Sequence, residues 1–355
     1  MKTRFGLKKW IVGLCIAGLL AVGAGHAAAG EDTAASIPVE LRGAGATFPA
    51  PLYSAWIKAY TSKQPGVRIE YEAVGSGEGV QKFLAREVDF AGSDAALTDE
   101  QMATVKNGVR LVPATAGMVV LAYHLRNLNG PLKLSREVYV DLLAGRISRW
   151  DDPRIQVLNP GLSLPKQNVT IVARQDSSGT TYALTNHLSA ISADWRDRGP
   201  GAGKLVDWPG NAMAVRGNEG VASRIKISEG AIGYVEYGFA KRLGLAMAWL
   251  QNRAGQFVEP SERTGQAALS DSLAHMPANL RLFLPDPEGK EAYPIVTFSW
   301  LLLHGKYSDH ARAAALKDFV DWGLGEGQEL ARALGYVPLP SEVARLSQAA
   351  VASVE

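Results

Sequence analysis

The sequence predicts an α/β fold of two lobes, each a central sheet flanked by helices, with two crossings of the chain as hinges. Short apolar runs typical of strands alternate with segments whose apolar residues recur at helical spacing. Two apolar strands, residues 118–124 and 292–303, stand far apart with other elements between them. This order predicts one lobe from residues 38–115 plus 295–350, and a second lobe from residues 116–294. A ligand would lie between them at the carboxyl ends of strands.

The first 29 residues predict a cleavable signal peptide. Basic residues precede an apolar run from Trp10 to about Ala24, and small residues follow. The run is too short, and its flanks are wrong, for a membrane span. We expect cleavage between Ala27 and Gly30. The single cysteine, Cys15, would leave with this segment, so we expect no disulfide, thiol catalyst or thiolate metal site.

The charge of the exported part argues against nucleic acid as a partner. The whole chain has a formal net charge of +2, and the leader has four basic residues and no acidic ones, which leaves −2. A nearly neutral protein has no global field that gathers nucleic acid. Any affinity for anions must therefore be local.

The first lobe begins with a strand, a glycine-rich turn and a helix. An apolar face that includes Trp56 predicts the helix. The turn places the Thr47 hydroxyl and the backbone of Ala46 and Phe48 at the helix entrance. Its spacing is not the G-x-G-x-x-G of a dinucleotide-binding fold.

Two more strands end in polar loops. Residues 67–74 alternate as a strand does and run into a loop with three glycines, where Ser76 is a candidate anion contact. Residues 88–93 predict a short strand that ends at Asp94, and Thr98 is expected to cap the helix that follows. Asp94 could equally be an ordinary turn residue, and its interest comes from these neighbouring loops.

The strongest candidate for an anion site is the loop between a strand at residues 169–173 and a helix at residues 181–191. A helix entrance presents unpaired N–H groups and the positive end of the helix dipole. Ser178 and Thr180 add hydroxyls, and Gly179 lets the backbone approach closely. Arg174 offers a planar fork suited to an oxyanion, and Asp176 can hold that fork. A simple capped helix is the alternative.

The rest of the chain completes the two lobes. A strand is expected at residues 231–235, a helix with Leu316, Phe319 and Val320 on one face, and a final helix. The polar stretch 199–218 predicts an excursion on the surface.

Four motifs carry a resemblance to a known family: residues 43–51, 88–94, 174–181 and 230–237. With them the chain resembles the periplasmic phosphate-binding proteins of bacterial phosphate ABC transporters, which have the type II fold of solute-binding proteins. The resemblance implies a monomer in the periplasm, without cofactor or catalysis. It would bind inorganic phosphate and deliver it to the membrane permease and ATPase subunits of the importer.

The resemblance also implies the ligand contacts. They are Ala46, Thr47, Phe48, Ser76, Asp94, Arg174, Ser178, Gly179 and Thr180. Asp176 would steady Arg174. Glu78 departs from the family, which often has a small residue there; its carboxylate would either oppose anion binding or point outward. Asp94 is the expected selectivity residue, since it can accept a hydrogen bond from phosphate but would face fully ionised sulfate with no proton between the two anions.

Three alternatives remain open. A secreted phosphatase would need a metal cluster or an activated nucleophile, and the histidines are scattered without metal-ligand spacing. A binder of another tetrahedral oxyanion, such as sulfate or molybdate, would differ only in selectivity. A sensor that signals phosphate without transporting it would use the same closed form.

Overall fold

The computed structural model describes residues 38–355 except residues 211, 271 and 272. The predicted signal peptide lies outside these residues. Most strands form one mixed sheet in the order β2-β1-β3-β12-β4-β8-β6-β7, with β9 paired to β4. A small second sheet has the order β11-β10-β5. The strands are β1 Val39–Gly45, β2 Val67–Glu72, β3 Phe90–Ser93, β4 Val109–Tyr123, β5 Lys133–Leu134, β6 Thr170–Arg174, β7 Met213–Val215, β8 Ala231–Glu236, β9 Ala246–Met247, β10 Trp249–Gln251, β11 Phe257–Val258 and β12 Val296–His304.

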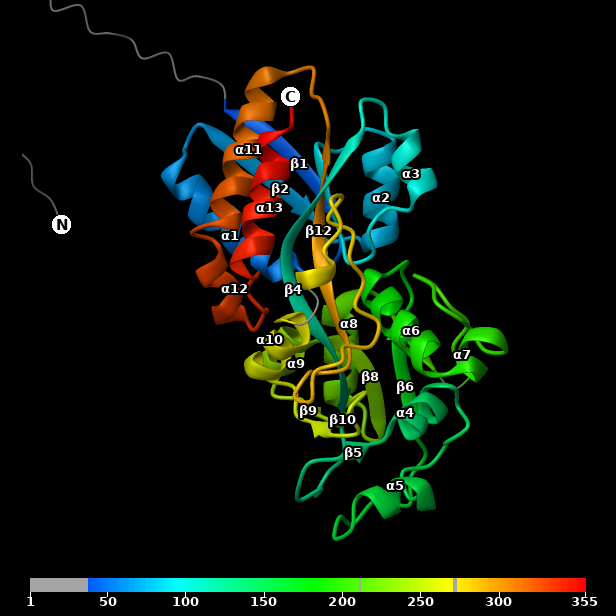
Figure 1. Cartoon of the computed structure of the whole chain (residues 1–355). Coiled ribbons are helices and arrows are strands. Elements are labelled where there is room, and N and C mark those ends of the chain that lie inside the picture. The colour runs from blue at the N-terminus through cyan, green and yellow to red at the C-terminus, as the bar shows by residue number, and fades with distance from the viewer. Residues whose placement is uncertain (1–37, 211, 271–272) are drawn as a thin grey trace, which may run out of the picture. The chain divides into compact units, whose positions relative to one another are not determined.

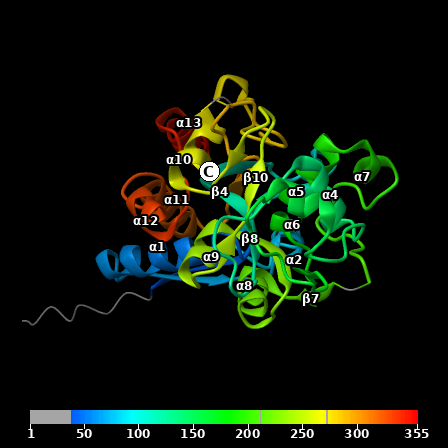
Figure 2. The ribbon, with the colours of Figure 1, turned by 90° about the horizontal axis from the view of Figure 1, so that it is seen from below.

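Helices flank this sheet, and the fold class is the α/β arrangement that the sequence predicts. Figures 1 and 2 both place α1, α11, α12 and α13 to one side of β4 and α4 to α7 to the other. The helices are α1 Ala50–Lys63, α2 Ser76–Leu84, α3 Asp99–Thr104, α4 Arg136–Leu143, α5 Pro153–Leu158, α6 Gly179–Ile191, α7 Ala193–Asp197, α8 Gly217–Ile227, α9 Tyr237–Arg242, α10 Glu262–Ser270, α11 His310–Leu324, α12 Gln328–Leu334 and α13 Ser341–Ala352, with a short 3₁₀ turn at Leu273–His275.

Strand β4 is the longest strand among the described residues and connects the two parts of the sheet (Figure 1). Its first part pairs antiparallel with β12, and residues 119–123 pair antiparallel with β8. The sequence predicted a strand only from residue 118, but the run before it also forms ladder bonds with β12. The division into two lobes at residues 115/116 and 294/295 remains a prediction.

A β-bulge interrupts the pairing of β4 with β12. Ser299 lies opposite Thr115, but Trp300 lies opposite Pro113, so Ala114 is an additional residue on β4. A bulge re-aims side chains in the strands that it joins. This bulge lies at Ser299, whose hydroxyl belongs to the polar cluster described below.

The expected helices form for the reasons seen in the sequence. Trp56 on the inner face of α1 is fully buried, and its indole N–H donates to the carbonyl of Gly327 at 2.8 Å. Thr98 caps α3 in a capping box with Gln101, as its sequence predicted. Helix α6 begins at Gly179, two residues earlier than expected, because the Ser178 hydroxyl accepts the Thr181 N–H at 3.1 Å.

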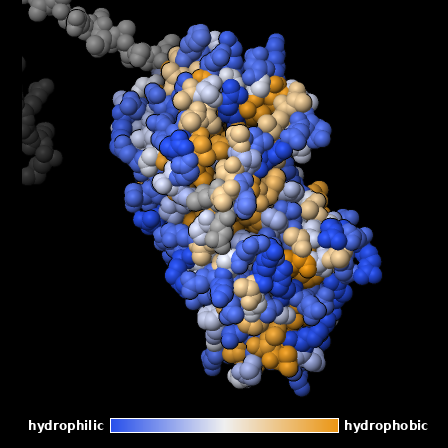
Figure 3. All heavy atoms as spheres, in the orientation of Figure 1, coloured by the Kyte–Doolittle hydropathy of each residue, from blue (hydrophilic) through white to orange (hydrophobic). Residues whose placement is uncertain are grey.

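The surface is mostly polar. Figure 3 shows hydrophilic residues over much of the visible face, with apolar residues in smaller groups. Across the part of the chain that the structure describes, the search for a helix both long and apolar enough to cross a bilayer finds none.

Candidate anion-binding site

The residues singled out by the sequence come from four separate strand ends. Residues 46–48 follow β1, Ser76 begins α2 after β2, Asp94 follows β3, and Arg174 is the last residue of β6. Parallel pairing of β1 with β2 and β3 brings the first three ends to the same edge. All of the predicted contact residues are buried. Hydrogen bonds between them, described next, join segments about a hundred residues apart.

Ser76 lies at the junction of two of these loops. Its hydroxyl oxygen accepts the backbone N–H of Gly179 at 3.1 Å and that of Asp94 at 3.3 Å. A Cβ on Gly179 would lie 2.5 Å from the Ser76 hydroxyl and 2.7 Å from the Asp94 Cβ. Only glycine therefore allows α6 to begin this close to the end of β3.

Asp94 is a buried carboxyl with unequal partners. One oxygen accepts the Ser299 hydroxyl at 2.8 Å, while the other lies 3.5 Å from the Thr180 hydroxyl, at the limit of a hydrogen bond. Burial raises the pKa of Asp94 to about 7, against the lowering effects of Ser299 and Arg174. Because its contact with Thr180 is so long, the second oxygen can also accept a hydrogen bond from a ligand.

Arg174 is held in a fixed orientation by Asp176. The Nε atom donates to Asp176 Oδ1 at 2.8 Å, and Nη2 pairs with Asp176 Oδ2. The remaining Nη1 lies 3.4 Å from the Thr180 hydroxyl. Burial alone would raise the pKa of Asp176, but the hydrogen bond and charge of Arg174 hold it below its ordinary value. The pair leaves one edge of the guanidinium directed toward Thr180.

The entrance of α6 uses its two hydroxyls differently. The Ser178 oxygen caps the helix, as noted above, and its hydrogen remains available as a donor. The Thr180 hydroxyl contacts Arg174, Asp94 and the side-chain amide of Asn218, the last at 3.1 Å. Thr180 therefore lies at the centre of the cluster.

The turn after β1 contributes Thr47 and the backbone of Phe48. The Thr47 hydroxyl oxygen accepts two N–H groups of Asn218, from the backbone at 3.1 Å and from the amide at 3.0 Å. The Phe48 ring packs on Tyr336, and its carbonyl accepts the Tyr336 hydroxyl at 2.6 Å. Ala46 already uses its own N–H and carbonyl, with Gly92 and Tyr71. Donors at this turn thus come from the two residues after Ala46.

In this cluster three residues that are 0% exposed have a backbone N–H group with no acceptor within the described residues: Phe48, Ser76 and Thr180. The backbone N–H of Thr47, which is 9% exposed, has no acceptor there either. Buried N–H groups without a partner are rare in folded proteins because each costs free energy. Two of the three lie at the entrances of α2 and α6, where the helix dipole favours negative charge. The arrangement suits a small anion.

Asn218 belongs to the cluster, although it was not among the residues predicted from the sequence. It is fully buried, donates to Thr47 and Thr180, and accepts the Glu236 N–H at 2.9 Å. Much of the stretch 199–218 is exposed or half-buried, as expected, but its last residue is not. One sequence feature could have indicated Asn218. Gly217 precedes Asn218 at the start of a helix, in the same way that Gly75 precedes Ser76.

Lys204 is a second residue that the sequence analysis missed. Its carbonyl accepts the Ser178 N–H at 2.8 Å, which fixes residue 204 against the start of α6. Its ammonium is close enough to Asp94 to lower the pKa of that carboxyl, and burial lowers the pKa of Lys204 itself. Asp94 therefore has a second positive charge in its surroundings besides that of Arg174.

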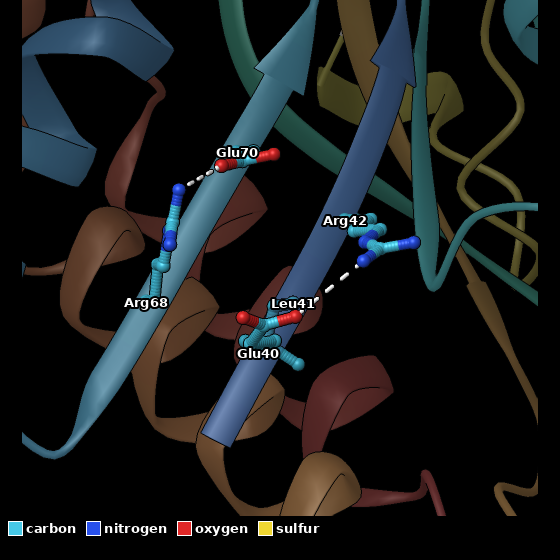
Figure 4. A pocket seen from close by; sticks show the side chains of 5 residues that line it. All are labelled: Glu40, Leu41, Arg42, Arg68 and Glu70. Carbon is cyan, nitrogen blue, oxygen red and sulfur yellow. Dashed lines mark hydrogen bonds and ion pairs between the residues drawn. The ribbon is translucent and has the colours of Figure 1, made fainter. Parts of the chain in front are cut away.

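Two cavities open beside the cluster, and a third is one of several that lie elsewhere on the described residues. One cavity of about 560 Å³ reaches Asp176 and Ser177, and one of about 360 Å³ reaches Thr47. Arg216 lines both. The third, about 170 Å³ on β1 and β2, is lined mainly by Glu40, Arg42, Arg68 and Glu70, with the ion pairs drawn in Figure 4. It shares no residue with the cluster.

No group of three or more histidine, cysteine or carboxylate side chains suited to a metal ion occurs within the described ranges. The buried His187 is held by the Tyr139 hydroxyl at 2.8 Å and the Pro285 carbonyl at 2.6 Å. Burial lowers the pKa of His187 to about 4, which keeps the ring neutral. His187 thus has a structural role in this fold.

Comparisons with known proteins show which family this chain belongs to. A family model described as a PBP superfamily domain matches residues 26–326. The chain is 40% identical over 310 residues to the phosphate-binding protein PstS of Pasteurella multocida, which covers 87% of this chain and 89% of that protein. It is also 40% identical over 305 residues to PstS of Haemophilus influenzae, covering 85% and 90%.

Solved structures share the fold. The periplasmic phosphate-binding protein PfluDING, solved with bound phosphate, has a TM-score of 0.71 at 21% identity and covers 88% of this chain and 93% of its own. A phosphate-binding protein from Stenotrophomonas maltophilia has the same TM-score at 22% identity, with the same coverage. At these identities the likeness concerns the fold.

Proposed function

This chain belongs to the PBP superfamily, and we propose that it captures inorganic phosphate outside the cytoplasm and delivers it to an ABC-type phosphate importer. It is a binding protein and not an enzyme, in keeping with relatives named for phosphate binding. We further propose that it works as a monomer in the periplasm after loss of its signal peptide. The permease and ATPase subunits of the importer are its partners.

The observation that carries this proposal is the set of three buried N–H groups without acceptors, next to a fixed arginine. The N–H groups of Phe48, Ser76 and Thr180 would donate to phosphate oxygens, together with Arg174 Nη1. The hydroxyls of Thr47, Ser178 and Thr180 add donors whose orientation can adjust. A small tetrahedral anion would satisfy these groups at once.

Asp94 would give the site its preference for phosphate. Phosphate near neutral pH keeps at least one proton, so a phosphate O–H can donate a hydrogen bond to the second oxygen of Asp94. Sulfate has no such proton and would face Asp94 as a second anion. A site that hydrogen-bonds one group rejects the analogue that lacks it by about 10⁴-fold or more.

Equilibrium titration of the purified mature chain tests the proposal. We expect one phosphate per chain by calorimetry, with sulfate binding at least about 10³-fold more weakly, because sulfate has no O–H group that could donate a hydrogen bond to the buried Asp94. Absence of binding heat with phosphate would overturn the proposal. Equal affinity for sulfate would instead favour a general oxyanion binder. Hydrolysis of a phosphate ester would point to a phosphatase.

A further inference from the structure

We propose that Glu78 and Arg216 form a latch across the mouth of the phosphate site, in which Arg216 also receives the arriving anion. This inference rests on the proposed function and concerns how fast phosphate enters and leaves. The Glu78 carboxylate forms an ion pair with Arg216, in which its Oε2 lies 3.6 Å from Arg216 Nη2. Glu78 lines the same cavity as Asp176 and Ser177.

The two side chains come from elements that meet at the site. Glu78 lies in the first turn of α2, whose first residue is Ser76, and Arg216 is the N-cap residue of α8. The side chain of Arg216 is 71% exposed and that of Glu78 is 45% exposed. Both can therefore leave the ion pair without any repacking of the core.

The backbone after Arg216 connects directly to the ligand cluster. The next residue, Gly217, donates its N–H to Asp176 Oδ1 at 3.0 Å, and Asn218 follows with its bonds to Thr47 and Thr180. The main chain after Arg216 is thus held by hydrogen bonds, while the Arg216 side chain is largely exposed. The guanidinium of Arg216 is exposed to solvent, and Arg216 lines the same cavity as Thr47.

Arg216 lines both of the cavities beside the cluster. These are the 560 Å³ cavity, which Asp176 also lines, and the 360 Å³ cavity, which Thr47 also lines. Among the residues that line the 360 Å³ cavity, Arg216 is the one cation and Glu219 the one anion. An anion that moves from solvent toward Thr47 passes the guanidinium of Arg216.

Two arrangements of the pair follow from these positions. With Arg216 free of Glu78, its charge attracts the anion to the mouth of the site. With the pair formed, the charge of Glu78 is neutralised and the segments that begin α2 and α8 are joined over the site. The pair would then slow release. An exposed ion pair contributes little energy, so we expect rate changes of two- to fivefold.

The test is a double-mutant cycle on phosphate kinetics with the full mature chain. The variants are Glu78→Gln, Arg216→Gln, the double variant, and the charge swap Glu78→Arg with Arg216→Glu. Release is measured by dilution of protein loaded with radioactive phosphate into excess unlabelled phosphate. Association is measured at low and high sodium chloride, because salt screens the attraction of exposed charges.

We expect each single variant to release phosphate about two- to fivefold faster, with no further increase in the double variant. The charge swap should bring release back toward the wild-type rate. Arg216→Gln should also associate more slowly and lose most of the salt dependence. The matched control is Glu70→Gln, which breaks the exposed Arg68–Glu70 pair of 2.7 Å on β2 and should change neither rate (Figure 4).

The latch would be overturned if the two single variants changed the release rate additively in the double variant, or if the charge swap did not bring the release rate back toward that of the wild type. Either outcome would leave phosphate binding intact. A wild-type chain that binds no phosphate would overturn both the latch and the proposed function. Calorimetry of the wild type, done first, separates these outcomes.

Discussion

Two buried carboxyls in this molecule show how similar burial can support different roles. Asp94 follows β3 and Glu236 ends β8, and their exposed fractions are 1% and 0%. Burial raises the pKa of Asp94 to about 7 and that of Glu236 to about 8. Neither burial nor pKa alone therefore separates a ligand contact from a structural residue.

The partners of the two carboxyls differ. Glu236 caps α9, and its two oxygens accept the N–H groups of Gly238 at 2.7 Å and Phe239 at 3.2 Å. Asp94 accepts the Ser299 hydroxyl at 2.8 Å and lies 3.5 Å from the Thr180 hydroxyl. It belongs to the cluster that contains the unpaired N–H groups. A carboxyl saturated by backbone donors stabilises its own helix, while one with an oxygen to spare can serve a ligand.

The largest expected effect on phosphate affinity comes from Arg174, which lies near Asp94, and the comparison is with Arg242, which lies near Glu236. Arg174→Ala should weaken binding of every oxyanion by about 10³-fold, since it removes a buried charged donor and leaves Asp176 unpaired. Arg242→Ala, beside Glu236, should leave phosphate affinity within about twofold. Calorimetry compares them, with Arg174→Lys as a second variant should the alanine form fail to fold. Normal phosphate affinity in Arg174→Ala would contradict the site.

The next effect concerns selectivity. Asp94→Asn should lower the preference for phosphate over sulfate by about 10²-fold or more, because the new amide can donate to sulfate, while phosphate affinity itself falls less. Glu236→Gln is the control and should keep the preference, since its position faces backbone donors. Competition titrations with both anions measure this. An unchanged preference in Asp94→Asn would remove Asp94 from that role and erase the contrast with Glu236.

The smallest effect is the dependence of stability on pH. A carboxyl with a raised pKa keeps its proton in the folded chain at pH values where the unfolded chain, with a pKa near 4, has lost it. Each of the two groups therefore lowers the free energy of unfolding as pH rises from about 4 toward 7 or 8, by at most about 1.4 kcal/mol per pH unit. Removing either group should flatten this slope.

Urea unfolding of wild type, Asp94→Asn and Glu236→Gln at pH 5 to 8 in buffer without phosphate measures the slopes. The difference between wild type and each variant isolates one carboxyl from other titrating groups. Added phosphate should alter the slope that belongs to Asp94 and leave that of Glu236 unchanged. Identical slopes in all three proteins would show that neither carboxyl holds its proton when buried.

The sequence was informative wherever the site is built from local patterns. Ser76, Arg174 and Thr180 stand at strand ends before helices, where glycine and hydroxyl residues follow apolar runs, and the structure brings them together. Such junctions can be recognised because strand and helix periodicity both stop there. Their convergence on phosphate stays a prediction until binding is measured.

What the sequence could not provide depends on long-range pairing. Ser299 is a single hydroxyl inside an apolar strand, and it reaches Asp94 only because β12 pairs with β3, with Trp300 opposite Ser93. Asn218 lies in a polar stretch and is buried through contacts with residues far along the chain. No local pattern encodes such a register.

The extra residue on β4 has a consequence for how this protein tolerates change in length. At the bulge Ala114 has no partner on β12, so its loss would make the pairs Ser299–Thr115 and Trp300–Pro113 neighbours in a regular ladder, with each side chain still on its own face. Loss of a regularly paired residue such as Ala116 would instead reverse the faces of its neighbours in the ladder. The effect of a deletion in β4 is therefore expected to depend on whether the lost residue has a partner on β12.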